Sequence, residues 1–323
     1  MNCKVCNSKT KRKYSGMFDN RHGYPGKFTI YECDSCGFMQ TKPQLSNNSL
    51  TKVYTNYYPK RDANIKEIFK NSKHIPSKKE IYKNGWATTC HFQTGGGQKV
   101  LDVGCGTCQS LLEIKTLDGE GWGIEVDQNS QKVAKKLNLK FHLGTIHNCK
   151  FPKKYFDLIT ASQVLEHEPN PKKFLKKCKQ FLKSGGQIIL SFPNTGSLYQ
   201  KIWGKKWLHW HIPYHLNHFN NKSIKRLLKN SGLTISSIKT ITPNLWTILQ
   251  IRSFLAKPKP GKRNYMWDGG QNSQKSNIEE TSFKIRMLNF LLSNINSLLF
   301  INRVIDNFGF GESFVIVLTE DGK

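Results

Sequence analysis

The sequence predicts an α/β fold in which helices cover both faces of a largely parallel β-sheet. From residue 99 onward, short apolar stretches typical of buried strands alternate with stretches typical of helices. The first of these strands runs into a glycine-rich turn and a helix, in "VLDVGCGTCQS" at 100–110. Acidic residues stand at the ends of the first two strands, Asp102 in "VLDVG" and Glu125 in "GIEV". Ligands of such sheets bind beyond the carboxyl ends of the strands, so these features predict a ligand site there.

Each element of the sheet can be placed by its local pattern. Strands are expected at 99–104, 119–126, 140–144, 155–162, 185–192, 233–242 and 312–320. Helices are expected at 109–117, 128–138, 171–183 and 221–232. The last strand comes after a gap in the alternation, and it can close the sheet.

The gap before the last strand holds two apolar helical segments, 245–256 and 285–308. The second segment places a row of apolar residues on one helix face, namely Leu288, Leu291, Leu292, Ile295, Leu298 and Leu299. We expect an amphipathic element that packs on the sheet; a lid over an acceptor site and a peripheral membrane contact are the alternatives. The polar stretch 257–281, which carries proline and glycine, is predicted to be a mobile loop.

The composition limits the classes of partner. The chain of 323 residues has 50 Lys and Arg against 22 Asp and Glu, a formal net charge of +28. Most of the basic residues are lysines scattered from end to end, whereas base reading and phosphate clamps favour arginine. The charge therefore indicates a solvated lysine-rich surface, and a nucleic-acid partner is not expected.

The sequence also bears on the compartment. The N-terminal stretch "MNCKVCNSKTKRK" lacks the apolar core of a secretory signal, and no stretch has the length and apolarity of a transmembrane helix. Nine cysteines in such a chain fit a reducing compartment, where cysteine serves as a metal ligand or a small core residue. We expect a cytoplasmic protein, of an oligomeric state that the sequence does not indicate.

Two CxxC pairs mark the N-terminal segment. Cys3 and Cys6 form the first pair, Cys33 and Cys36 the second, and a strand-like "KFTIYEC" lies between them. Four thiolates in two such pairs suit tetrahedral zinc, and a segment this short hardly buries a core without a metal. The sequence predicts a zinc ribbon over residues 1–44; a redox dithiol or a chance pairing is the alternative.

The glycine-rich turn distinguishes between two classes of cofactor. The dinucleotide pattern GxGxxG fails here, because Gln109 stands at the third glycine position. The carboxylate of Asp102 would repel a pyrophosphate, whereas it would attract the ammonium and sulfonium groups of S-adenosylmethionine. A carboxylate at Glu125 can accept hydrogen bonds from both ribose hydroxyls. These residues therefore favour an adenosyl cofactor, with Thr145 and Ile146 of the following turn beside the adenine.

The chain resembles class I S-adenosylmethionine-dependent methyltransferases, in the branch with an N-terminal zinc ribbon. The resemblance covers roughly residues 98–242 and the ribbon. It is carried by "VLDVGCGT", "GIEVD", "FDLITASQVLEHEPNPKKFLKKCKQFLKSGGQIILSFPN" and "PYHLNHFNNKSIKRLLKNSGL". It implies a Rossmann-like sheet of seven strands with a helical insertion before the last one.

The resemblance also implies a division of the chain and a set of cofactor contacts. The expected segments are a zinc ribbon at 1–44, a helical connector at 45–95, the core at 96–243, a helical cap with a mobile loop at 244–309, and the final strand at 310–323. The implied cofactor contacts are Asp102, Gly104, Cys105 and Gly106 on the methionine and ribose, Glu125 and Val126 on the ribose and adenine, Thr145 and Ile146 on the adenine, and Gln163 beneath the transferable methyl group.

One residue departs from the pattern of that family. Cys108 stands where the family usually has a third glycine. We expect its side chain to narrow the pocket and to weaken cofactor binding without abolishing it.

The segment after the fifth strand is rich in aromatic and imidazole side chains. It contains Tyr199, Trp203, Trp207, Trp210 and Tyr214 together with His209, His211, His215 and His218. Histidine can take the proton of an attacking acceptor, and aromatic faces can form the floor of a sugar site. His215 and His218 are the candidate catalytic bases; a structural role and a second metal site are the alternatives. Glu166 and His167 in "VLEHEPNP" are expected to help to form the site.

These inferences lead to one function and one alternative. We expect an enzyme that transfers a methyl group from S-adenosylmethionine to a small-molecule acceptor, such as a sugar, a polysaccharide precursor or a related metabolite. Transfer to oxygen is favoured over carbon or nitrogen. The alternative is a scaffold or interaction protein that has the methyltransferase fold and zinc ribbon but does not catalyse.

Overall fold

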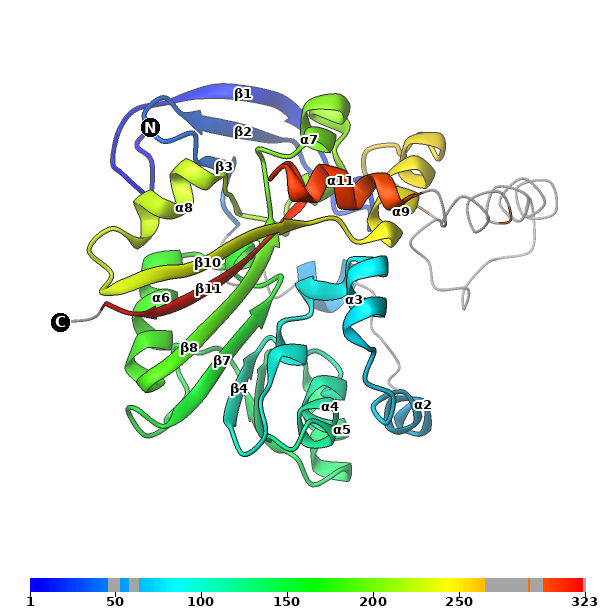
Figure 1. The fold of residues 1–323 in the computed structure, drawn as a ribbon. Coiled ribbons are helices and arrows are strands. Elements are labelled where there is room, and N and C mark those ends of the chain that lie inside the picture. The colour runs from blue at the N-terminus through cyan, green and yellow to red at the C-terminus, as the bar shows by residue number, and fades with distance from the viewer. Residues whose placement is uncertain (46–52, 58–63, 265–289, 291–298, 322–323) are drawn as a thin grey trace.

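The computed structural model of the chain describes residues 1–45, 53–57, 64–264, 290 and 299–321. Its centre is a sheet of seven strands in the order β10-β11-β8-β7-β4-β5-β6 (Figure 1). The strands are β4 (Lys99–Val103), β5 (Glu120–Glu125), β6 (Lys140–Leu143), β7 (Phe156–Ser162), β8 (Leu182–Pro193), β10 (Leu233–Ile241) and β11 (Ser313–Glu320). All seven expected strands are thereby confirmed.

The last strand lies inside the sheet and not at its edge. β11 pairs antiparallel with β8 on one side and with β10 on the other, so that Val315 faces both Ser191 and Lys239. Because β11 runs against β8, its first residue, Ser313, lies opposite Pro193 at the carboxyl end of β8. Residues just before β11 therefore lie at the edge of the sheet where ligands of such sheets bind.

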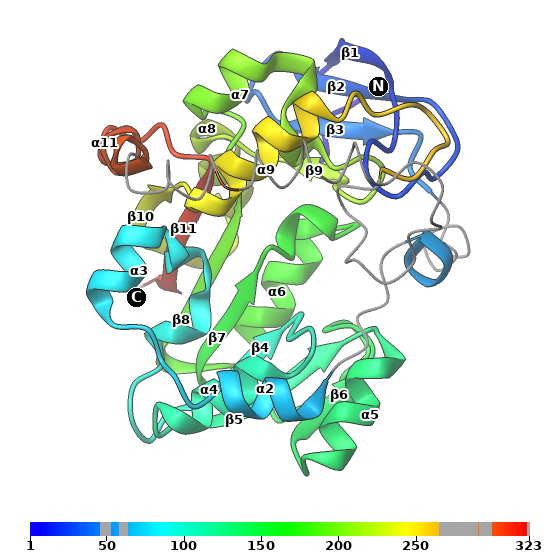
Figure 2. The ribbon, with the colours of Figure 1, turned by 90° about the vertical axis from the view of Figure 1, so that its right-hand side faces the viewer.

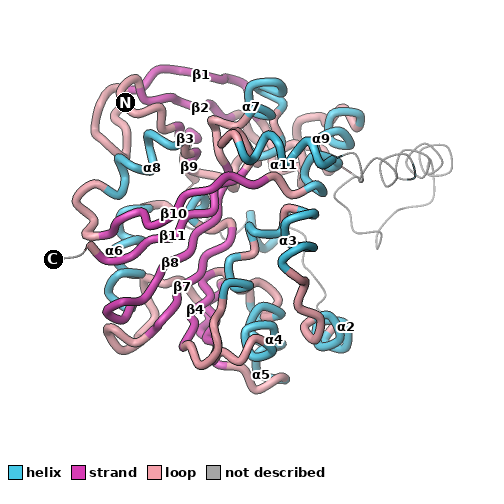
Figure 3. The backbone as a smooth tube through the Cα atoms, in the orientation of Figure 1, coloured by secondary structure: helices cyan, strands magenta, loops and turns pink. Residues whose placement is uncertain are grey.

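Helices cover both faces of the sheet, as Figures 1 and 3 show. On one face lie α4 (Gln109–Thr116) and α5 (Gln128–Lys136), whose Leu111 and Val133 join one buried apolar cluster. On the other lie α6 (Pro171–Phe181) and α8 (Asn221–Leu228), whose Phe174 and Ile224 join a second cluster. The burial of these two faces, at about 25 cal/mol per Å² of apolar surface, supplies the main driving force for folding.

The helix starts are encoded locally. Asn170 accepts a hydrogen bond from the backbone N–H of Lys173, and Pro171 occupies the first turn of α6. Asn220 and Ser223 form a reciprocal capping box at the start of α8. These caps explain why the helix positions could be predicted from the sequence.

A second, smaller sheet joins the N-terminal segment to the core. It has the order β1-β2-β3-β9, and Figure 2 shows it above the main sheet beside α7. Its strands are β1 (Thr10–Met17), β2 (Phe28–Cys33), β3 (Met39–Lys42) and β9 (Asn217–His218). The last of these comes from the core segment, because Met39 pairs with His218 and Gln40 with Asn217. The N-terminal segment is therefore docked on the aromatic segment that follows β8.

The connector lies against the carboxyl ends of the central strands. Its elements are a single turn η1 (Val53–Tyr57), helices α2 (Ile65–Asn71) and α3 (Lys78–Asn84), and turns η2 (Trp86–Thr88) and η3 (Cys90–Gln93). The Cys90 backbone N–H donates to Ser162 Oγ at 3.0 Å, and Ser191 Oγ donates to the Thr88 carbonyl oxygen at 2.6 Å. Helix α3 ends at Asn84, because the next residue, Gly85, has a φ of 72°.

The remaining elements surround the same edge of the sheet. They are η4 (Leu165–His167), α7 (Leu198–Trp203), η5 (Gly204–Lys206), η6 (Leu208–Trp210), α9 (Asn244–Leu255) and α11 (Ile301–Asn307). Most of the predicted loop at 257–281 and of the apolar helix at 285–308 lies outside the described residues. Within the described part of the chain, no helix has the length and apolarity to cross a membrane.

A buried acid–imidazole contact fixes the connector to the core, and it can be tested by unfolding. His91 Nε2 lies 2.6 Å from Glu113 Oε2, and Gln109 Nε2 donates to Glu113 Oε1 at 2.8 Å. Glu113→Ala should lower the free energy of unfolding by about 1–3 kcal/mol, because it leaves the buried His91 ring and the partly buried Gln109 amide without their acceptor. Urea titration is the measurement. Glu120→Ala is the matched control, since its exposed pair with Lys140 is worth about 0–1 kcal/mol. Equal losses in the two variants would contradict the prediction.

Candidate functional site

The glycine-rich turn after β4 is shaped for a close approach of a ligand. Gly104 has a φ of 78°, and a Cβ there would meet Val164 Cγ2 at 2.6 Å. Gly106 has a φ of 55°, and a Cβ there would meet nothing within 4 Å. A side chain at Gly104 would therefore clash with Val164, whereas the space beside Gly106 is empty. A ligand could contact the backbone directly at Gly106.

Two carboxylates flank this turn. Asp102 is 4% exposed, and its Oδ1 accepts a hydrogen bond from Thr160 Oγ1 at 2.7 Å. Glu125 accepts from the Gly106 N–H through Oε2 at 3.1 Å and from the Val126 N–H through Oε1 at 2.7 Å. Burial raises the pKa of Glu125, against the opposite effect of these N–H donors. A buried negative charge below the turn and an acceptor beside it suit a cationic ligand that carries hydroxyl groups.

The other expected cofactor residues differ in what they present. Val126 is 53% exposed, and Thr145 is exposed with its N–H bonded to Asn148 Oδ1 at 2.9 Å. Ile146 is 1% exposed within the core, so its side chain offers no surface to an adenine in this structure. The side chain of Cys105 is likewise buried, so this residue can contact a ligand only through its backbone.

The expectation that Cys108 narrows the pocket conflicts with the position of its side chain. Cys108 is fully buried in the apolar cluster beneath α4 and α5, and its Sγ lies 3.5 Å from the Ser130 carbonyl oxygen. The glycine usual at this position has a backbone reason, since Cys108 precedes α4 with a φ of 64°. The substitution therefore affects backbone strain and core packing, and the thiol lines no open cleft.

Gln163 lies where the sequence places it, directly after β7. Its φ is 57°, and its Nε2 donates to Ser313 Oγ at 3.1 Å and contacts Ser191 Oγ at 3.3 Å. These two serines belong to β11 and β8, so the amide is held over the ends of neighbouring strands.

The two candidate bases, His215 and His218, lie in different environments. His218 lies in β9 and is 2% exposed, with its Nε2 2.9 Å from Thr41 Oγ1 of the ribbon. Burial lowers the pKa of His218 to about 3, and its contacts join the ribbon to the core. These surroundings favour a structural role for His218 over that of a catalytic base, because its ring nitrogen contacts the neighbouring strand.

His215 has a different environment. Its Nδ1 lies 2.8 Å from the His209 carbonyl oxygen, and its Nε2 lies 3.9 Å from Glu166 Oε1. His215 and Glu166 are 5% and 1% exposed, and burial raises the pKa of Glu166 to about 8. Burial also lowers the pKa of His215 well below its usual range. His215 is thus neutral and directs one nitrogen at a buried acid.

The aromatic floor expected for an acceptor is only partly present. Trp207, Trp210 and Tyr214 are each 2% exposed or less. The two tryptophans pack with Phe28 and Ile30 of the ribbon strand β2. These rings form the core between ribbon and sheet, because β9 draws their segment against β3.

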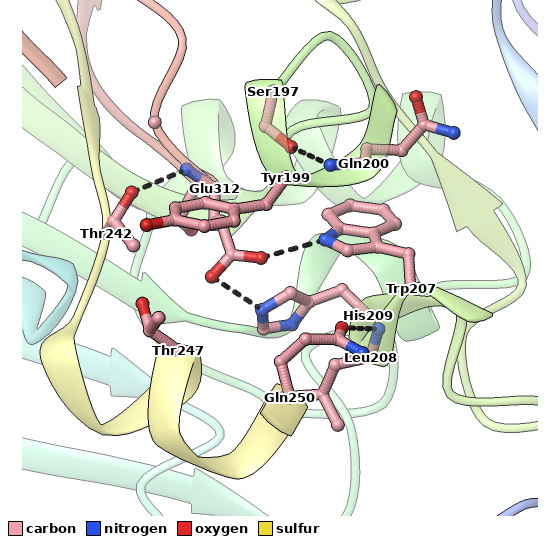
Figure 4. Close-up of polar contacts among 12 residues, drawn as sticks. Ser197, Tyr199, Gln200, Trp207, Leu208, His209, Thr242, Thr247, Gln250 and Glu312 are labelled. Carbon is pink, nitrogen blue, oxygen red and sulfur yellow. Dashed lines mark hydrogen bonds and ion pairs between the residues drawn. The ribbon is translucent and has the colours of Figure 1, made fainter. Parts of the chain in front are cut away.

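A second acid–imidazole pair was missed by sequence reasoning (Figure 4). Glu312 precedes β11 and is 1% exposed; its Oε1 accepts from Trp207 Nε1 at 2.9 Å. Its Oε2 lies 3.9 Å from His209 Nε2, and neither atom has a hydrogen-bond partner among the described residues. Only the insertion of β11 beside β8 brings this acid to the site, and no local pattern signals it.

The four cysteines of the two CxxC pairs converge. Sγ–Sγ distances are 3.7 Å for Cys3–Cys36, 3.4 Å for Cys6–Cys33 and 3.5 Å for Cys6–Cys36. A tetrahedral zinc ion with Zn–S bonds of about 2.3 Å separates its sulfurs by about 3.8 Å. The geometry of the cluster is therefore compatible with a zinc ribbon.

Comparison with known proteins identifies the core. The family model described as "Methyltransferase domain" matches residues 62–238. The chain belongs to this methyltransferase family. The expected membership of the class I family is thereby confirmed, whereas the match does not reach the cysteine cluster and leaves the zinc-ribbon branch a prediction.

Curated relatives match shorter stretches. The ubiquinone biosynthesis O-methyltransferase of Bradyrhizobium diazoefficiens is 32% identical over 104 residues, which cover 31% of this chain and 41% of that protein. An uncharacterized protein of Methanocaldococcus jannaschii is 27% identical over 152 residues, 47% of this chain and 71% of that protein. The chain thus spans less than half the length of the first of these relatives.

Solved structures of low identity are also similar. A SAM-dependent methyltransferase from Archaeoglobus fulgidus has a TM-score of 0.43 and 17% identity, over 85% of this chain and 100% of that one. A geranyl diphosphate C-methyltransferase from Streptomyces coelicolor has a TM-score of 0.44 and 12% identity, over 75% and 80%.

The role of Glu125 can be tested by cofactor binding. Glu125→Gln should raise the dissociation constant for S-adenosylmethionine at least tenfold, about 1.4 kcal/mol. The amide replaces one acceptor oxygen with an NH₂ group, which cannot accept a hydrogen bond from a backbone N–H or from a ribose hydroxyl. Isothermal titration calorimetry is the measurement. Asp127→Asn is the matched control, since it removes a nearby charge while keeping an α5 cap, and it should change the constant less than twofold. Wild-type affinity in Glu125→Gln would contradict the assignment.

Proposed function

We propose that this chain transfers the methyl group of S-adenosylmethionine to a hydroxyl oxygen of a small-molecule acceptor, of the sugar, polysaccharide-precursor or related metabolite class. The observation that carries the proposal is the bare glycine turn between Asp102 and Glu125. The turn leaves Gly106 open to a ligand, with an acid on either side.

The residues of the chain would divide the work of binding the cofactor. Asp102 contributes negative charge beneath the ammonium and sulfonium groups, and Glu125 accepts the ribose hydroxyls. Val126 and Thr145 border the adenine through exposed surface. Gln163 is held by Ser313 and Ser191 beneath the reacting methyl group. When bound, S-adenosylmethionine supplies the electrophilic methyl group.

The acceptor side favours a ligand with hydroxyl groups. Glu312 Oε2 and His209 Nε2 face each other across 3.9 Å without hydrogen-bond partners among the described residues. A hydroxyl group between them could donate to one and accept from the other. An apolar ligand would bind less tightly here, because it would leave these buried polar atoms without hydrogen-bond partners. His215 remains the candidate base for the acceptor proton, because its Nε2 carries a lone pair when Nδ1 donates to a carbonyl.

The first experiment is a calorimetric titration with S-adenosylmethionine and S-adenosylhomocysteine, with Asp102→Ala compared with the unchanged chain. Micromolar binding that the substitution weakens at least tenfold is the expected result, because the buried charge opposite the ligand is lost. Absence of binding to either compound in folded protein would overturn methyl transfer and favour the scaffold alternative.

An acceptor screen follows if the cofactor binds. Nucleotide sugars and other hydroxylated metabolites come first, with catechol-type quinone precursors as the comparison, because several relatives are named as ubiquinone biosynthesis O-methyltransferases. Turnover with hydroxylated sugars is expected. Turnover with the quinone precursors alone would replace the proposed acceptor class.

We also propose that the four converging cysteines hold zinc in the reducing environment that free thiols require. The ion would fix the turns that carry the two CxxC pairs and thereby the strands β1–β3 that dock on β9. In this role the zinc stabilises the ribbon and does not take part in methyl transfer.

Removal of one thiolate tests the ribbon. Cys33→Ser should lower the zinc content of anaerobically purified protein by one equivalent. It should also make residues 1–45 sensitive to protease, because the ion is the main cross-link that stabilises this segment. Plasma mass spectrometry and limited proteolysis measure the two effects. Cys149→Ser, which alters a buried cysteine outside the cluster, is the control and should keep its zinc. Unchanged metal content in Cys33→Ser would exclude this zinc site.

A further inference from the structure

A group of one acid and two imidazole side chains, buried except for the half-buried His167, lies where η4 meets the segment before β9. We propose that Glu166, His167 and His215 bind a divalent transition-metal ion of the zinc type, at a site separate from the cysteine cluster. One ligand atom from each of these residues lies within 4.8 Å of the other two. The three residues come from two segments that only the fold brings together.

Glu166 supplies the observation that points to a cation. Its side chain is 1% exposed, and neither carboxylate oxygen has a hydrogen-bond partner among the described residues. Buried carboxylates in proteins are normally paired, hydrogen-bonded or metal-bound, because the bare group loses its hydration. The nearest basic atom is His215 Nε2 at 3.9 Å, beyond hydrogen-bond reach. The space between the two atoms is therefore of the kind that a bridging cation fills.

The two imidazoles are oriented as metal-binding histidines usually are. His215 Nδ1 lies 2.8 Å from the His209 carbonyl oxygen, and His167 Nδ1 lies 3.0 Å from the Tyr214 carbonyl oxygen. A carbonyl oxygen can only accept, so each Nδ1 carries the proton and each Nε2 keeps its lone pair. A backbone carbonyl on the outer nitrogen is a common second-layer partner of a metal-bound histidine.

The backbone around the group is cross-linked. The Leu216 N–H donates to the Glu166 carbonyl oxygen at 2.9 Å. Asn217 Nδ2 donates to the Glu168 carbonyl oxygen at 2.6 Å. These contacts bind the segment that carries His215 to the turn that carries Glu166, so the ligands are held in place before an ion arrives.

The donor set indicates the class of ion. Two nitrogens and one carboxylate are typical of zinc and related transition metals, whereas magnesium and calcium prefer oxygen. A tetrahedral site with bonds of about 2.0–2.1 Å places its ligand atoms about 3.4 Å apart, so the Glu166–His215 distance would have to shorten by about 0.5 Å. His211 Nδ1 lies 3.3 Å from His215 Nε2 and donates to it when His215 Nδ1 carries the proton, so a bound ion would displace this hydrogen bond.

The site would have a consequence for catalysis that rests on the proposed function. Glu166 is three residues after Gln163, which is the residue proposed to lie beneath the methyl group. Three protein ligands leave a coordination position open, as in catalytic zinc sites. An acceptor hydroxyl bound there would have a lower pKa and would release its proton to solvent water, and His215 would then serve as a ligand and not as the base.

The metal content of the chain and its variants tests the proposal, and the measurement needs neither S-adenosylmethionine nor an acceptor. The full chain and its variants are incubated with excess zinc, desalted and analysed by plasma mass spectrometry. The unchanged chain should hold one equivalent more than Glu166→Gln and one more than His215→Gln. His218→Gln, which alters a buried histidine of the same segment outside the three ligands, should hold as much as the unchanged chain. Equal metal content in the unchanged chain and a folded Glu166→Gln variant would overturn the proposal.

A second measurement covers the case in which the variants fail to fold, as judged by circular dichroism. Cobalt(II) is added to the unchanged protein after it has been stripped of metal and given one equivalent of zinc, which the four thiolates of the cysteine cluster bind first. One equivalent should bind with ligand-field absorption and without the charge-transfer bands of cobalt thiolates, because the site contains nitrogen and oxygen only. Absence of stoichiometric binding, or the appearance of thiolate bands alone, would overturn the proposal. Neither result depends on methyl transfer, so failure here and failure of the cofactor titration are distinguishable.

Discussion

The burial of acidic side chains at the carboxyl edge of the main sheet is the constraint on which the rest of the site depends. Asp102, Glu125, Glu166 and Glu312 all lie along this edge. Parallel strands bring their carboxyl ends together, and the connector, the ribbon-docked segment and α9 then cover them. A carboxylate removed from water must find donors or a cation nearby. The four acids differ in how far the protein meets this requirement, and the differences outline the chemistry.

Two of the acids are satisfied within the protein, and two are not. Asp102 accepts from Thr160, and Glu125 accepts from backbone N–H groups of the glycine turn. Glu312 has one oxygen bonded to Trp207 and one without a described partner, and Glu166 has neither oxygen bonded. The satisfied acids flank the expected cofactor position, and the unsatisfied acids are the ones assigned above to the proposed acceptor side and metal site. The polar character proposed for that side rests on groups that the fold itself leaves without donors among the described residues.

The ribbon and the core form one unit because a strand is shared between them. β9 belongs to the core segment by sequence and to the ribbon sheet by pairing, and Thr41 reaches His218 and the His215 carbonyl oxygen. Ribbon stability is therefore coupled to the position of His215, at a distance from the cysteines. A zinc ion in the ribbon would act on the acceptor side through this shared strand and would need no contact with the substrate.

The sequence by itself determined the alternation of strands and helices, the glycine turn, its two flanking acids and the cysteine pairs, because each is written in local pattern and spacing. It could not determine the position of β11, which depends on long-range pairing with β8 and β10 and which alone brings Glu312 to the site. It also could not separate His215 from His218, since both stand in one histidine-rich stretch and differ only in what packs against them. The aromatic residues of that stretch suggested an exposed floor, yet pairing of β9 with β3 buried them. Tertiary structure decided these points because burial and partners, unlike propensity, are set by segments far apart in the chain.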